Sequence, residues 1–141
     1  MIIRVTTAVL AVLWLLSCLG CAAQTPEEAV RKRWNQLIAS ALNSDTEAGL
    51  QVFDPAYVSR QGPEVVKLRL TGFGDVLRAG NIKAGDLRID KVTIGPDGKT
   101  AQVNHSMRTS DGQWLPQAPF GSWVAVDKTW YVTWSDAEAG P

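Results

Sequence analysis

The residue best suited to acid–base chemistry in this 141-residue chain is its only histidine, His105. An imidazole changes charge near neutral pH, so a single ring inside a pocket can act as a general base. An isomerase or dehydratase would also need an acid aimed at the same substrate. The spacing of the aspartates near element ends or on polar faces does not bring them together: Asp54, Asp75, Asp86 and Asp90. A histidine satisfied within the core is therefore the alternative interpretation.

Other common catalytic patterns are missing from the sequence. There is no Gly-x-Ser-x-Gly nucleophile motif, no metal-ligand spacing and no glycine-rich phosphate loop. The sequence accordingly predicts no cofactor and no metal site.

The aromatic residues are the stronger indication of a binding site. Six tryptophans supply large apolar side chains with a polar edge. They either fill a core or line a pocket or protein-binding face. The candidate ligand-binding residues are Trp34, Tyr57, His105, Trp114, Trp123 and Trp130. The apolar loop from Trp114 to Phe120 is expected to fold back as a lid or to present a contact surface.

The first 21 residues have the layout of a secretory signal: Arg4, an apolar run from Val5 to Leu16, and then small residues with two cysteines. The strongly apolar part is shorter than the roughly 20 residues of a membrane-spanning helix, so cleavage is expected. Because no charge appears between Arg4 and Glu27, an uncleaved anchor is the alternative.

The end of this segment resembles the lipobox of bacterial lipoproteins. Leu15-Leu16-Ser17-Cys18 matches that pattern, so Cys18 is the expected lipidation site and Cys21 the alternative. The resemblance implies that acyl chains such as palmitate anchor the protein to a bacterial membrane, facing the periplasm or the outside. Two incidental cysteines in a signal peptide are the simpler interpretation.

The composition beyond the leader limits the remaining functions. No cysteine follows Cys21, so residues 22–141 contain neither an internal disulfide nor a thiol nucleophile. Without Arg4, 13 of the 14 basic residues remain beside 14 acidic ones, a net charge of −1 that offers no strong field for nucleic acid. About 120 residues suit one domain with a single core.

Three helices are expected first. Thr25 to Glu28 has the capping-box signature, and an apolar stripe follows at helical spacing: Val30, Trp34, Leu37, Ile38, Ala41 and Leu42. Ser44 with Glu47 predicts a short second helix to about Phe53, and Tyr57-Val58 a brief strand. Gly62-Pro63 opens the third helix, which Gly80-Asn81 ends. Gly72 and Gly74 inside it indicate a break or a close neighbour.

Four antiparallel strands are expected after the helices. From Asp86 onward the period becomes two, and the apolar parity changes near Asp90-Lys91, which is typical of a bulge. The strand from Ala101 should bury its odd-numbered residues, including His105. A two-residue turn at Asp127-Lys128 would place Trp123, Trp130 and Trp134 on one sheet face.

Helices followed by a bulged meander predict an α+β fold in which a curved antiparallel sheet wraps around three N-terminal helices. The chain from about Thr25 to Ser135 resembles the nuclear transport factor 2-like superfamily, also called SnoaL-like or cystatin-like. The resemblance rests on the long first helix, Asp54-Pro55-Ala56-Tyr57, the turn at Asp97-Gly98, and Gly121-Ser122-Trp123 leading to Asp127-Lys128-Thr129-Trp130-Tyr131-Val132. Many members carry glycine where Lys128 stands.

The expected organisation is a signal peptide and lipobox over residues 1–21, a tether over 22–25, the domain over 26–135 and a disordered tail over 136–141. In the superfamily a cone encloses a pocket between the first helix and the sheet, and functions differ widely. The leading hypothesis is a non-catalytic cell-envelope lipoprotein that binds a small apolar ligand or an envelope protein. An isomerase, dehydratase or cyclase using His105 and a purely structural module are the alternatives, and a homodimer is a further option.

Overall fold

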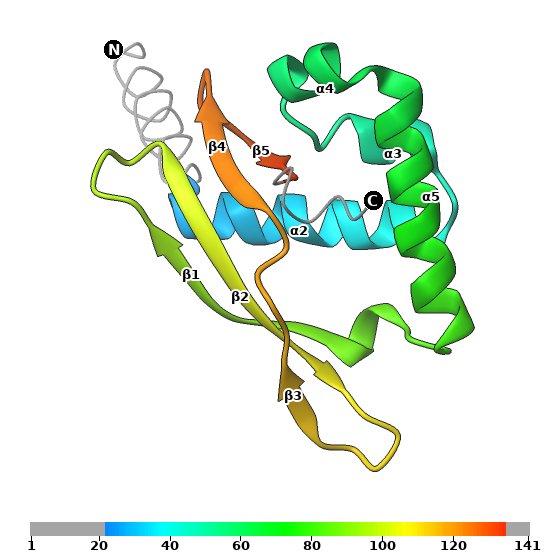
Figure 1. Cartoon of the computed structure of the whole chain (residues 1–141). Helices are drawn as coiled ribbons and strands as arrows, with labels where there is room; N and C mark the ends of the chain where they lie inside the picture. The colour runs from blue at the N-terminus through cyan, green and yellow to red at the C-terminus, as the bar shows by residue number, and fades with distance from the viewer. Residues whose placement is uncertain (1–21, 135–141) are drawn as a thin grey trace, which may run out of the picture.

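The computed structural model describes residues 22–134, which form an α+β fold (Figure 1). The expected signal peptide, Cys18, Cys21 and the expected tail 136–141 lie outside the described residues. Within them the helices are α2 (Pro26–Leu42), α3 (Thr46–Leu50), α4 (Pro55–Gln61) and α5 (Pro63–Ala79), followed by the 3-10 turn η2 (Ala84–Asp86). No helix in this part of the chain is long and apolar enough to cross a membrane.

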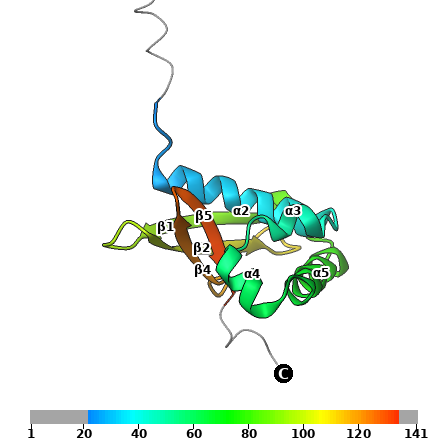
Figure 2. The ribbon, with the colours of Figure 1, turned by 90° about the horizontal axis from the view of Figure 1, so that it is seen from above.

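Helix α2 begins and packs as its sequence predicts. The Thr25 hydroxyl accepts from the Glu28 amide at 3.2 Å, and the Glu28 carboxylate accepts from the Thr25 amide at 3.0 Å, which completes the capping box. The stripe is buried, with Leu42 only partly so. Trp34 therefore points from α2 toward the sheet, and α2 packs against the outer two strands of the sheet path and against α5 (Figure 2).

The segment after α2 differs from the sequence prediction in two ways. The second helix, α3, begins after Asp45, whose carboxylate accepts from the Ala48 amide, and ends at Leu50 rather than near Phe53. The predicted strand at Tyr57-Val58 is wrong, because both residues lie in α4. Asp54 caps this helix through the Ala56 amide and Pro55 occupies its first turn, so the local start signal outweighs the strand preference of two residues. The described part thus has four α-helices instead of three.

Helix α5 continues through both of its glycines. A Cβ at Gly74 would lie 2.3 Å from the carbonyl oxygen of Ala41, so this glycine permits close packing of α5 on α2. A Cβ at Gly72 would meet nothing within 4 Å. The helix ends as predicted, with the left-handed conformation at Asn81, whose φ is 53°.

The sheet contains five described strands rather than four: β1 (Leu87–Ile94), β2 (Thr100–Arg108), β3 (Trp114–Pro116), β4 (Ser122–Val126) and β5 (Thr129–Thr133). All pairs are antiparallel in the order β1-β2-β4-β5, and β3 pairs with the far end of β2. The predicted loop from Trp114 to Phe120 therefore begins as a strand. Three residues suffice for this because the Thr109–Gln113 hairpin brings them back to β2.

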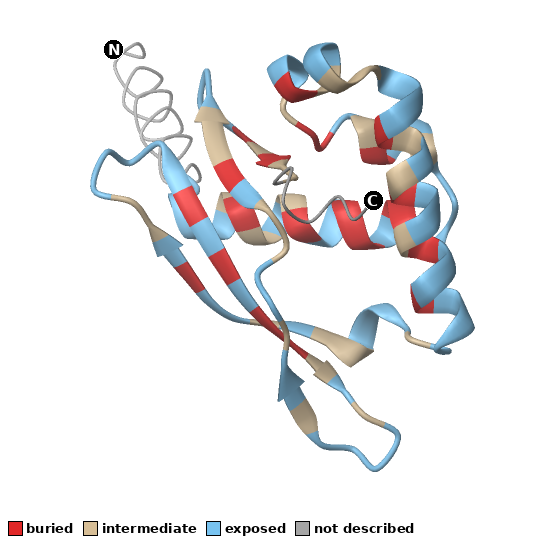
Figure 3. Cartoon of the chain, viewed as in Figure 1, coloured by how far each residue is buried: buried red, intermediate tan, exposed pale blue. Residues whose placement is uncertain are grey.

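The predicted bulge in β1 is confirmed. Ile89 pairs with His105 and Lys91 with Asn104, so Asp90 is the extra residue. Because of this extra residue, Leu87 and Ile89 before it and Val92 and Ile94 after it face the same side of the sheet. Figure 3 shows the matching alternation of buried and exposed residues along β2. Ser106 departs from the alternation, since it is buried although it lies on the other face.

The β4–β5 turn is also confirmed. Asp127 and Lys128 both have positive φ, 48° and 66°, as a two-residue hairpin turn requires. Ala125 pairs with Trp130, and Trp123 with Val132, so the tryptophans of this hairpin share one face. The segment before α4 joins the same edge, because the Asp54 amide donates to the Val132 carbonyl and the Val132 amide to the Val52 carbonyl, both at 3.0 Å.

Candidate functional site

His105 lies on the helix-facing side of β2 against Trp34 of α2. The ring centroids are 4.8 Å apart, and His105 is 9% exposed. Its Nδ1 atom is buried and has no hydrogen-bond partner among the described residues. Burial lowers the pKa of the imidazole, and the charge of Asp90 opposes this shift without cancelling it. The ring is therefore neutral at pH 7, and one of its polar atoms is unused.

Three partly exposed aromatic side chains gather beside this pair, and we call Phe73, Phe120 and Trp134 the aromatic cluster. They come from α5, from the connection between β3 and β4, and from the residue that follows β5. Phe120 lies 4.5 Å from Trp134 and 4.9 Å from Phe73, between ring centroids. Phe120 also meets Trp34 edge-on at 6.2 Å. Trp34 thus links the aromatic cluster to His105.

The other inner candidates are part of the core around this site. Trp123, Tyr57 and Trp130 are almost fully buried. The Tyr57 hydroxyl accepts from Arg69 at 2.6 Å, so its polar group is satisfied. The buried Nε1 of Trp123, in contrast, has no hydrogen-bond partner in the described chain. These three side chains belong to the buried core and form no accessible wall.

Trp114 is not brought together with the other candidates. It pairs with Arg108 in the ladder, which places it on the face of the sheet opposite His105. The guanidinium carbon of Arg88 lies 4.4 Å from the centroid of its ring, and that of Arg108 5.7 Å. Trp114 therefore lies outside the core, with two cations close to its ring.

Polar contacts on this outer face are made within the chain. Ser106 donates a hydrogen bond to Asp90 Oδ2, and Arg88 Nε donates to Asp90 Oδ1 at 2.9 Å. The Ser106 bond, followed by Arg88, lowers the pKa of Asp90. Although Asp90 acts electrostatically on His105, its carboxylate is bound on the opposite side of the strand. No group of three or more His, Asp or Glu side chains within residues 22–134 is placed to hold a metal ion.

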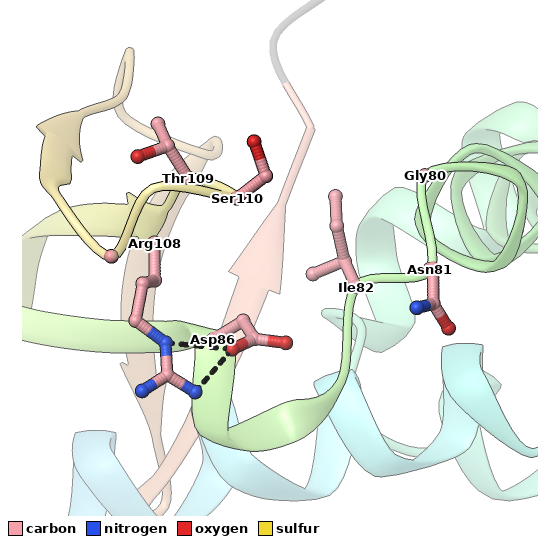
Figure 4. A pocket seen from close by; sticks show the side chains of 8 residues that line it. Gly80, Asn81, Ile82, Asp86, Arg108, Thr109 and Ser110 are labelled. Atoms are coloured by element: carbon pink, nitrogen blue, oxygen red, sulfur yellow. Dashed lines mark hydrogen bonds and ion pairs between the residues drawn. The ribbon is translucent and has the colours of Figure 1, made fainter.

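An open polar pocket of about 440 Å³ lies between the α5–η2 loop and the β2–β3 hairpin (Figure 4). Arg108 lines one side of it and donates to Asp86 through Nε and Nη2, at 2.9 and 2.6 Å. Asn81 and Ile82 face the hairpin residues Thr109 and Ser110 across the opening. Because its only cation is neutralised by Asp86, the pocket has no net charge to select a ligand.

Sequence reasoning identified His105 and Trp34 but did not connect them with Phe73. Phe73 recurs at helical spacing with Val66, Leu70 and Leu77, which indicates the apolar side of the helix. Only the packing shows that it lies at the margin, in contact with Phe120. No spacing rule relates these two residues, because they are 47 positions apart (120 − 73). A partly apolar loop beside a tryptophan-rich hairpin was the one available signal.

The chain was also compared with known proteins. No protein-family model matches it. No curated protein sequence matches it either.

Proposed function

We propose that this protein is a cell-envelope lipoprotein whose nuclear transport factor 2-like cone binds a small, largely apolar molecule without transforming it. The cone assignment is supported by the order of elements, helices before a bulged antiparallel meander, and by α2 packing on one side of the sheet. The anchor rests on the lipobox resemblance, with Cys18 lipidated or, as the alternative, Cys21.

The unused Nδ1 of His105 carries the binding proposal. A buried polar atom without a partner is costly, and native proteins satisfy most of them with protein, water or ligand. This atom lies beside Trp34, which contacts the aromatic cluster through Phe120. A ligand with an apolar body and one polar group would pack against the partly exposed rings of the aromatic cluster, and these rings must move apart for the polar group to reach the buried Nδ1 of His105.

The enzyme alternative has weaker support. The neutral ring of His105 could accept a proton, but a proton-transfer reaction on carbon also needs a group that stabilises the developing negative charge. Asp90 is the carboxylate whose charge acts on His105. It is bound by Ser106 and Arg88 on the outer face. A binding role needs only the apolar surface and the single polar atom that the site offers.

The decisive experiment is native mass spectrometry of the full chain extracted in mild detergent from the cells that produce it. We expect one co-purifying small molecule per chain, of a size that fits a ligand pocket of about 300–1,000 Å³. Phe120→Ala should reduce its retention, whereas Val126→Ala, an exposed residue at the far hairpin, should not. Ligand-free protein, or equal retention by both variants, would contradict the proposal. Co-purification of a protein instead would indicate a partner-binding surface.

The anchor is tested separately by feeding the producing cells labelled palmitate. Cys18→Ser should abolish incorporation, and Cys21→Ser should leave it intact. The reverse pattern would assign the lipid to Cys21, and label in neither the parent nor the variants would exclude acylation.

A further inference from the structure

Arg69 of α5 is a partly buried cation without a carboxylate partner in the described chain. Its Nη1 atom donates to the Tyr57 hydroxyl at 2.6 Å, and this neutral group is the only acceptor that Arg69 has within residues 22–134. None of the ion pairs in that range includes Arg69. A partly desolvated charge is unfavourable unless a counter-ion accompanies it. This position therefore favours the binding of an anion from outside the described chain.

Tyr57 fixes the position of this guanidinium. Its side chain is fully buried in α4, which packs beside α5 (Figure 2). The phenol oxygen accepts from Arg69, but no described residue accepts the phenolic proton. A second cation, Arg60, lies with its guanidinium carbon 5.6 Å from the centroid of the Tyr57 ring, and it also lacks a carboxylate partner in the described ranges. Two uncompensated cations thus lie close to one phenol.

This pair of arginines adjoins the aromatic cluster. Arg69 and Phe73 are four positions apart in α5, so their side chains are neighbours on the surface of the helix. Phe53 stacks on Tyr57, with the ring centroids 6.1 Å apart, and on Trp134 at 5.6 Å. Trp134 in turn meets Phe73 edge-on at 6.3 Å. Arg69 is therefore connected to the aromatic cluster along its own helix and through the aromatic rings beside Tyr57.

The carboxylates of α5 itself leave Arg69 free for an anion. The helix contains two acidic residues, and both are ion-paired elsewhere: Glu64 with Lys67, and Asp75 with Arg78. A ligand carboxylate at Arg69 would therefore meet no unpaired negative charge on this helix. A cationic ligand, in contrast, would be repelled by both arginines.

We infer that the ligand of the aromatic cluster is an amphipathic carboxylic acid, whose carboxylate binds Arg69 while its apolar body lies on the cluster. An arginine presents five N–H donors in a planar fork that suits a carboxylate, and Tyr57 occupies one of them. Arg69 is the binding residue, and the buried Tyr57 is a positioning residue that orients it. The inference rests on the proposed function, because it names the chemical class of the molecule bound at that site.

A pair of matched probes tests the charge. Isothermal titration calorimetry measures the binding of 2-naphthoate and of the neutral 2-naphthamide to the full chain in a nonionic detergent, with detergent alone as the blank. We expect the carboxylate to bind about tenfold to a hundredfold more tightly than the amide, because a hydrogen bond to a charged group contributes more than a neutral one. Arg69→Gln should abolish this preference and leave the affinity for 2-naphthamide unchanged.

Arg31→Gln is the matched control, because it removes an equal charge from α2 at an arginine ion-paired with Glu27. It should keep the preference for the carboxylate. Equal affinities for the two probes in the parent chain, or a preference that survives Arg69→Gln, would overturn the inference and leave the apolar site standing. Binding of neither probe would contradict both the apolar site and the inference.

The role of Tyr57 has its own test. Tyr57→Phe keeps the buried ring and removes the acceptor that orients Arg69, so the preference for the carboxylate should fall about two- to tenfold. A purely structural role of the hydroxyl would instead weaken the binding of both probes equally. An unchanged preference in this variant would refute the positioning role.

The molecule that co-purifies with the full chain provides an independent test. Released from the protein, it should ionise as an anion and form a methyl ester, as a carboxylic acid does. A neutral molecule would overturn this inference while supporting the proposed function, whereas ligand-free protein would contradict both.

Discussion

His105 and Ser106 are consecutive residues of β2 and both are buried, but their polar groups have opposite surroundings. On the outer face, Ser106 donates to Asp90, which also accepts from Arg88. On the helix-facing side, His105 Nδ1 has no partner in the described chain. The outer face is thus completed by the protein's own side chains, whereas the inner face leaves one hydrogen-bonding position open.

Helix α5 shows the same contrast between its two sides. Gly74 faces α2, and its missing side chain is required by the Ala41 carbonyl. Gly72 faces outward and meets nothing. In both elements, a feature explained by packing lies beside one that nothing in residues 22–134 explains.

The largest expected loss of stability comes from substitutions on the helix-facing side of the sheet. Trp123→Ala should lower the free energy of unfolding by about 3–5 kcal/mol, because it removes a fully buried aromatic side chain. Trp114→Ala on the outer face should cost much less, since its ring is partly exposed. Urea denaturation at pH 7 measures both, and equal losses would break the distinction between the faces.

Alanine substitutions at the two glycines of α5 should change the free energy of unfolding in opposite directions. Gly74→Ala should destabilise by about 1–3 kcal/mol, because its Cβ would overlap the backbone of α2. Gly72→Ala should stabilise the monomer by up to about 1 kcal/mol through helix propensity. Thermal unfolding at low protein concentration checks this pair, and destabilisation by Gly72→Ala would mean that the outward position is constrained within the monomer.

His105 should make stability depend on pH in a defined window. Its pKa in the folded state is lowered from 6.5 by burial, so below pH 6.5 the unfolded chain binds a proton that the folded chain does not. The free energy of unfolding should therefore fall as the pH decreases from about 6.5 toward the folded-state pKa. His105→Phe should remove this dependence of the free energy of unfolding on pH. Chemical denaturation between pH 7 and pH 5 measures it, and an unchanged dependence in the variant would contradict the role of His105.

The smallest effect is on the outer face. Ser106→Ala should raise the pKa of Asp90, because the serine hydroxyl is the main cause of its lowered value. Arg88→Gln should raise it less. Carboxyl-detected NMR titration measures the pKa directly, and an unchanged value in Ser106→Ala would show that this hydrogen bond does not hold the carboxylate.

Local signals identified much of the fold in advance. The capping box of α2, the β1 bulge and the two-residue turn at Asp127-Lys128 all depend on neighbours within a few positions, and all are confirmed. The errors at Tyr57-Val58 and at β3 arose where short segments carry weak preferences. At Tyr57 the helix start at Asp54-Pro55 prevailed, and at β3 the pairing partner was supplied by the preceding hairpin.

The sequence by itself determined which residues alternate, which helices are capped and that His105 shares the apolar side of its strand. These properties follow from periodicity and cap chemistry, which act over a few residues. Tertiary structure alone decided that Trp34 contacts His105, that Phe73 meets Phe120, and that Trp114 lies outside. Contacts between distant segments depend on register and helix packing, and one chain's pattern does not encode those distances.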